Sequence, residues 1–248
     1  MKKNTGIQNA FKAGVWYSIS AIAAKSISII TTPIFTRMMT TSDYGLAATF
    51  SSWYSIFLII CTANLSYSHS RGKIDFQNNF VKYVGATHTL SYLITGIFSA
   101  IALVFISPVS KALDMNPLLM VLLLLYLFAG GTVNLAQSEN RYQYDYKKNI
   151  FITLFTTVGT VAFTFLFLIF IKENRYYAKI LGFVVPAILL AGWIFISELQ
   201  KKAFCINFEY WKYGLRISLP LVFHTISLNI LTQSDRIIIN KFCGNDAA

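Results

Sequence analysis

The sequence predicts an all-α membrane protein, a polytopic bundle of transmembrane helices. Of the 248 residues, 55% are hydrophobic and 12% are charged, whereas about a quarter of an average soluble domain is charged. Spanning a bilayer takes about 20 mostly apolar residues. Because lipid offers no partner to backbone groups, each apolar run of that length should be a helix. Seven runs qualify, at about 13–36, 45–66, 83–107, 117–138, 150–171, 177–197 and 214–239.

The seventh run opens in the same way as the first. Phe11-Lys12-Ala13-Gly14 and Trp211-Lys212-Tyr213-Gly214 are 200 residues apart. The identity is thin, and coincidence is the alternative. A hydrophobic unit that repeats within a membrane protein is typical of transporters with two lobes. We therefore expect residues 1–200 to form a first lobe of six helices. Residues 201–248 should then hold the cytoplasmic connection and the first helix of a truncated second lobe.

The net charge of +11 reports topology rather than a nucleic-acid partner. With the N-terminus in the cytoplasm, thirteen basic residues fall on the cytoplasmic side and seven on the other side. This bias follows the positive-inside rule. The thirteen are Lys2, Lys3, Lys12, Arg71, Lys73, Lys82, Arg141, Lys147, Lys148, Lys201, Lys202, Lys212 and Arg216.

Motifs of enzyme, cofactor and metal chemistry are missing from the sequence. It has no metalloprotease, P-loop or dinucleotide-binding pattern. The cysteines Cys61, Cys205 and Cys243 are too scattered for a disulfide framework or a metal site. We therefore expect no catalytic residue, no cofactor and no metal site. The start, Met1-Lys2-Lys3 before a long apolar run, predicts a retained first helix rather than a signal peptide.

Polar residues form a stripe along the first run. Residues seven apart share a helix face, and residues three or four apart flank it. Ser18, Lys25, Ser28 and Thr32 therefore line one side. Lys25 is the one charge deep within a run, so we favour a lysine that faces a water-filled cavity over one that snorkels to the interface. The last run carries a matching stripe, which should face the first across a central cavity: Ser218, Thr225, Asn229, Thr232 and Arg236.

Acidic residues contrast with Lys25. In the first six runs, every aspartate and glutamate falls in or beside a predicted loop, and Asp235 lies near the far end of the seventh. A cavity with a buried cation and no buried anion favours an anionic guest. A phosphate or pyrophosphate head group would fit.

Two stretches carry a resemblance to a known family. The first runs from Thr32-Pro33 through Arg37 to Asp43-Tyr44-Gly45, and the second from Tyr213 to Gly244, with Leu219-Pro220 and Asp235-Arg236. They resemble the first two helices and the seventh helix of Wzx-type O-antigen and capsular polysaccharide flippases. Those proteins belong to the multidrug/oligosaccharidyl-lipid/polysaccharide exporter superfamily.

The resemblance implies two six-helix lobes around a central cavity in a bacterial inner membrane. It implies that the protein moves an undecaprenyl-pyrophosphate-linked oligosaccharide, an O-antigen or capsule repeat unit, between the leaflets. Arg37 and Asp43 would then belong to an outer gate and Asp235 to the facing lobe. Substrate would be bound by Lys25, Ser18, Ser28, Thr32, Thr225, Asn229 and Arg236. The expected small-molecule partners are the lipid-linked substrate and membrane lipid. The expected protein partners are a polysaccharide polymerase and a chain-length regulator.

Three alternatives remain at this point. A drug or organic-cation exporter of the same fold would need buried carboxylates, and the predicted spans hold none. A membrane enzyme of polysaccharide assembly would need a larger outer loop or a histidine beside an acid. An assembly subunit without transport activity is compatible with the sequence.

Overall fold

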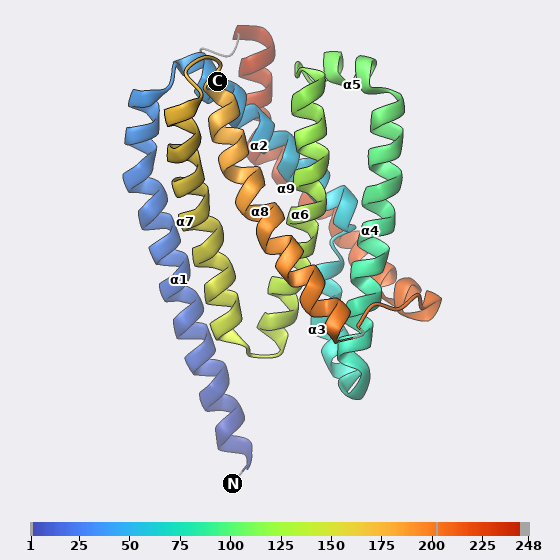
Figure 1. The fold of residues 1–248 in the computed structure, drawn as a ribbon. Coiled ribbons are helices and arrows are strands. Elements are labelled where there is room, and N and C mark those ends of the chain that lie inside the picture. Colours follow the sequence, from blue (N-terminus) through green and yellow to red (C-terminus); the bar gives the residue numbers. More distant parts are fainter. Residues whose placement is uncertain (1, 202, 244–248) are drawn as a thin grey trace.

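The chain folds as a bundle of long helices, as predicted (Figure 1). The computed structural model describes residues 2–201 and 203–243, and the side chains of residues 10–201, 203–234 and 238. Within this part, seven helices are long and apolar enough to cross a membrane. They coincide with the seven apolar runs, and no strand occurs in the described residues. The protein is therefore a multi-pass helical membrane protein.

The long helices run up and down in chain order (Figure 1). The seven spans are α1 (Lys2–Met38), α2 (Thr41–Thr62), α4 (Phe80–Val104), α6 (Pro117–Tyr142), α7 (Tyr146–Phe170), α8 (Tyr176–Gln200) and α9 (Phe208–Cys243). The connections after α2, α6 and α8 lie at the N-terminal end of the bundle, and those after α1, α4 and α7 lie at the opposite end. This alternation matches the predicted topology.

Two connections are helical themselves. Between α2 and α4 the chain forms the 3₁₀ turns η1 (Leu65–Tyr67) and η2 (Gln77–Asn79) around the short helix α3 (Ser68–Asp75). Between α4 and α6 it forms α5 (Ile106–Ala112). The predicted second run extends to residue 66, but α2 ends at Thr62 because Ala63 and Asn64 take left-handed φ angles of 45° and 52°. The Ala63 N–H there bonds to the Ile60 carbonyl.

Side-chain caps fix where α6 and α7 begin. The Asn116 side chain accepts from the Leu119 N–H, and Pro117, which has no N–H to leave unsatisfied, opens α6. The Asp145 carboxylate accepts from the Lys148 N–H and caps α7. Exposed N–H groups at a helix start need such partners. The caps therefore place the short turns between spans at defined residues.

Contacts between neighbouring long helices hold the bundle together. α7 packs against α1 on one side and α8 on the other, while α6 packs against α2, α4 and α8. The main apolar core lies among α2, α6 and α8 and includes Phe50, Leu123 and Ile180. α9 packs mainly against α2 and α4. The division of the chain into residues 1–200 and 201–248 stays a prediction.

Candidate functional site: a hydroxyl-lined pocket

A pocket of about 400 Å³ lies among α1, α2, α7 and α8. Eight of its lining residues are serines or threonines, and they come from the three helices α1, α2 and α7. One of the eight, Thr164 of α7, is nearly fully buried. The polar lining is Ser28, Thr31, Thr32, Tyr44, Ser51, Thr156, Thr157, Thr160, Thr164 and Lys179. No aspartate or glutamate lines the pocket.

The hydroxyl groups of this pocket bond back to their own helices. Ser28 donates to the Ala24 carbonyl at 3.2 Å, and Thr32 donates to the Ser28 carbonyl at 2.7 Å. Thr31, Ser51, Thr156 and Thr157 donate to their own helices in the same way. A hydroxyl that donates to a carbonyl keeps its acceptor lone pairs free. In this arrangement the wall therefore offers acceptors, which suit a ligand rich in O–H or N–H donors.

Lys179 brings a positive charge to the pocket. Its side chain is buried near the start of α8, and its ammonium lies 3.6 Å from the centre of the Tyr44 ring and 5.3 Å from that of Phe35. Attraction between a desolvated cation and an aromatic face is worth about 2 kcal/mol. These rings therefore hold the ammonium at the pocket wall.

The predicted gate segment forms a side-chain N-cap at the start of α2. The Asp43 N–H donates to the Thr40 hydroxyl at 3.1 Å, and that hydroxyl donates to the Asp43 carboxylate at 2.7 Å. The other Asp43 oxygen accepts from the Tyr176 N–H at 3.3 Å, while Arg175 donates to the Met38 carbonyl. These bonds fasten the α1–α2 turn to the start of α8. Tyr44, the next residue of the motif, then reaches the pocket.

Only part of the polar stripe of α1 lines the pocket. Ser28 and Thr32 line it. Lys25 is exposed and lies about one turn of α1 from Ser28 towards the N-terminal end. Ser18 is exposed, donates to the Gly14 carbonyl and lies beyond the pocket, and Arg37 is exposed near the end of α1. Their roles in substrate binding and gating stay predictions.

The α9 stripe lies against α2. The Asn64 amide donates to the Thr225 hydroxyl at 2.9 Å, and Asn229 donates to the Thr225 carbonyl. Ser218 is fully buried and Thr232 is exposed. α1 packs mainly on α7 and α9 mainly on α2. That the two stripes face each other across a central cavity stays a prediction. The predicted roles of Asp235 and Arg236 concern side chains outside the described residues.

Comparison with known protein families shows which family the chain belongs to. A family model described as "Polysaccharide biosynthesis protein" matches residues 10–248. The chain belongs to this family. Wzx-type polysaccharide flippases belong to it as well, so the resemblance in the sequence is confirmed. No match was found among curated proteins or among solved structures.

Membership in the polysaccharide biosynthesis family, together with the seven spans, assigns the chain to polysaccharide-related membrane transport. The pocket has features that suit such a role in this family, since carbohydrates are rich in hydroxyl donors. Aromatic faces and acceptor oxygens are the groups that contact them. Tyr44 and the threonines of α7 supply both.

Sequence analysis missed several pocket residues. The spacing of Thr156, Thr160 and Thr164 places them on one face of α7, and this signal was available. Lys179 was counted only among the seven basic residues of the far side, and it lies in the first turn and a half of α8. Only the packing of α8 against α1 and α2 shows that it reaches the pocket.

Two of the acids predicted in or beside loops are helical and buried. Glu139 and Glu198 were placed beside loops, but α6 continues to Tyr142 and α8 to Gln200, so both acids lie within helices. Their side chains are 4% and 3% exposed. The bundle therefore does hold buried carboxylates, at the N-terminal end and apart from the hydroxyl-lined pocket.

Proposed function

We propose that this protein flips an undecaprenyl-pyrophosphate-linked oligosaccharide across the bacterial inner membrane, with its N-terminus in the cytoplasm. In this proposal α1–α8 form one lobe of a two-lobed transporter, and α9 opens the other. The protein acts as a transporter and not as an enzyme. The observation that carries the proposal is the pocket among α1, α2, α7 and α8, lined by hydroxyls and one lysine without an acid.

The cost of moving the substrate explains why such a wall is needed. Carrying a charged head group through hydrocarbon unaided would cost tens of kcal/mol by Born-type estimates. Cations replace the lost hydration of phosphate, and hydroxyls replace that of sugar. Lys25 supplies a cation on α1, and the pocket one turn away supplies the acceptors. Alternating exposure of this surface to the two leaflets by rocking of the lobes would complete the transfer.

The test uses a strain that lacks the gene and carries variants of the complete gene. The deletion should accumulate lipid-linked repeat units on the cytoplasmic leaflet and lose surface polysaccharide, and the wild-type gene should restore export. Lys25→Ala should abolish export at an unchanged level of protein in the membrane, and Lys25→Arg should keep part of it, because the charge is retained.

Two results would contradict the proposal. Normal export by the deletion strain combined with sensitivity to cationic drugs would favour a drug exporter instead. Normal export with Lys25→Ala would make this lysine structural. Lys111→Ala is the matched control, since Lys111 is an exposed lysine on α5 at the opposite end of the bundle, and export should not change.

A further inference from the structure

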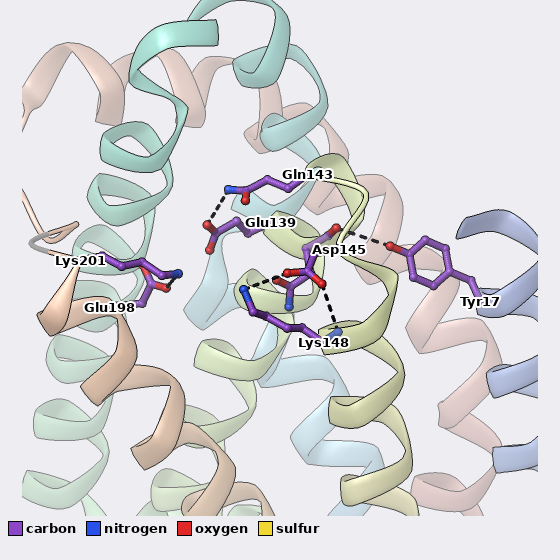
Figure 2. Close-up of polar contacts among 8 residues, drawn as sticks. Tyr17, Glu139, Gln143, Asp145, Lys148, Glu198 and Lys201 are labelled. Atoms are coloured by element: carbon purple, nitrogen blue, oxygen red, sulfur yellow. Dashed lines mark hydrogen bonds and ion pairs between the residues drawn. The ribbon is translucent and has the colours of Figure 1, made fainter. Parts of the chain in front are cut away.

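Two buried carboxylates lie at the N-terminal end of the bundle, on neighbouring helices (Figure 2). Glu139 comes from α6 and Glu198 from α8, each within the last turn of its helix. They are among the most buried charged side chains that the structure describes. Buried carboxylates in a membrane protein are costly and commonly functional.

The partners of the two acids are unequal. Glu198 accepts from the Lys201 ammonium at 2.6 Å through one oxygen, while its second oxygen, Oε2, is buried and has no donor. Glu139 accepts only a neutral bond, from the Gln143 amide at 2.8 Å. Figure 2 shows Lys201 extending from the α8 side towards Glu139. A buried carboxylate without a cation of its own is strongly destabilising.

Other groups around the pair are already engaged or neutral. On α7, the Lys148 ammonium pairs with Asp145 at 2.8 Å, and Lys147 acts on Asp145 from the exposed surface. On α4, Tyr92 accepts a hydrogen bond from Thr132, and His88 lies within electrostatic range of Lys201. On α1, Tyr17 donates to the Asn140 carbonyl at 3.5 Å. Both lysines that act on Glu139, Lys148 and Lys201, are thus bound to other carboxylates.

We propose that Glu139 and Glu198 share one proton and form a proton-binding site of this lobe. Two carboxylates in one buried site do not both ionise easily. A single proton removes one of the two negative charges. The O–H group that it forms can also donate a hydrogen bond, which the pair lacks at Oε2 of Glu198. The step is a plain protonation, in which hydronium gives its proton to one carboxylate oxygen and leaves as water.

Lys201 remains the charged member of the cluster. Burial opposes its charge, but the bond to Glu198 and the charges of Glu139, Glu198 and Asp145 outweigh burial and raise the pKa of Lys201. Lys201 therefore keeps its charge, and the proton of the proposed site belongs to the carboxylates.

The position of the site links it to the second half of the molecule. Lys201 opens the connection from α8 to α9, and Ala203 in that connection packs against Gly85 of α4. Protonation of the pair weakens the hold of Glu198 on Lys201 at the start of this connection. The proton site stands on this geometry by itself, whereas its use in driving the lobes rests on the proposed function.

Infrared difference spectroscopy tests the site without any substrate. The complete protein is purified, placed in lipid nanodiscs and moved from neutral to alkaline pH. A protonated carboxylic acid shows a C=O stretching band that an ionised carboxylate lacks. The wild type should show one such band at neutral pH and lose it on the alkaline side. No band in the wild type at neutral pH would overturn the proposal, whether or not any variant folds.

Variants then locate the band. Glu139→Gln and Glu198→Gln should each remove it, because the remaining acid is left with Lys201 and ionises. Glu173→Gln removes an exposed glutamate of the connection between α7 and α8, at the opposite end of the bundle, and the band should persist. A band that survives in both glutamine variants would reject the shared proton. A band that behaves as expected in a protein that fails the export test supports the proton site and rejects only the flippase.

Discussion

At the scale of single residues, Gly182 sets how closely α8 approaches α7. A Cβ added there would lie 2.0 Å from the Thr164 hydroxyl and 3.0 Å from the Thr164 Cα. Backbone cannot give way as a flexible side chain can. We therefore expect Gly182→Ala to lower the free energy of unfolding by about 1–3 kcal/mol, the usual range for overpacking. Thermal unfolding in detergent measures the change, and export should fall with it because Thr164 lines the pocket.

Gly192 is the matched control on the same helix. A Cβ at Gly192 meets nothing within 4 Å. Alanine favours a helix interior over glycine by up to about 1 kcal/mol. Gly192→Ala should therefore be neutral or stabilising. Equal losses of stability in the two variants would show that contact with Thr164 is not the cause.

His69 makes stability depend on pH. It is fully buried in α3, and its Nε2 lies 2.9 Å from the Thr87 hydroxyl, which itself donates to the Val84 carbonyl. Burial, reinforced by His88, lowers the pKa of His69 from 6.5 to about 3. Between pH 6.5 and 3, His69 binds a proton in the unfolded chain but not in the folded chain. The free energy of unfolding therefore falls as the pH drops from 6.5 towards 3.

We expect His69→Gln to flatten this pH dependence, because glutamine can donate to Thr87 and does not titrate. The measurement is the melting temperature of wild type and variant at a series of pH values from neutral to acid. The wild type should lose stability more steeply on the acid side. Parallel profiles would mean that His69 does not carry the effect.

At the scale of elements, the N-cap at Thr40 joins three helices. It ends the turn after α1, begins α2 and, through Asp43, meets the start of α8. Loss of such a cap costs about 1 kcal/mol. We expect Thr40→Ala to lower the free energy of unfolding by about this amount, and Thr40→Ser to keep most of it because serine retains the hydroxyl. Chemical unfolding in detergent compares the three proteins, and a serine variant as unstable as the alanine variant would contradict a capping role.

At the scale of the whole molecule, the arrangement of the spans predicts which residues face which side. Lys147 lies at the N-terminal end and Lys111 on α5 at the opposite end, and both are exposed. The excess of basic residues at the N-terminal end predicts that it is cytoplasmic.

Cysteine labelling tests this orientation. The background protein has Cys61, Cys205 and Cys243 replaced by serine. A membrane-impermeant thiol reagent is then applied to spheroplasts whose inner membrane is intact. It should label Lys111→Cys and leave Lys147→Cys unlabelled. Lysed cells should label both, which controls for accessibility. The reverse pattern in intact cells would refute the topology.

The sequence by itself determined the fold class and the family. Length and apolar content fix a membrane helix, because hydrocarbon offers backbone groups no other partner. All seven runs therefore became helices, and the resemblance carried by the segment from Thr32 to Gly45 was confirmed by the family match. The α1 stripe also follows from helical periodicity, which brings Ser28 and Thr32 to one side.

Tertiary packing alone decided which polar groups meet. Lys179 and Tyr44 are 135 positions apart, and they come together because α8 packs beside α2. Glu139 and Glu198 looked like loop residues because hydropathy falls before the helices end, whereas hydrogen bonding carries each helix on for about another turn. A hydropathy pattern records where lipid is tolerated. It does not record which face of a helix a neighbour covers, and that contact is what places a charge in a pocket or buries it.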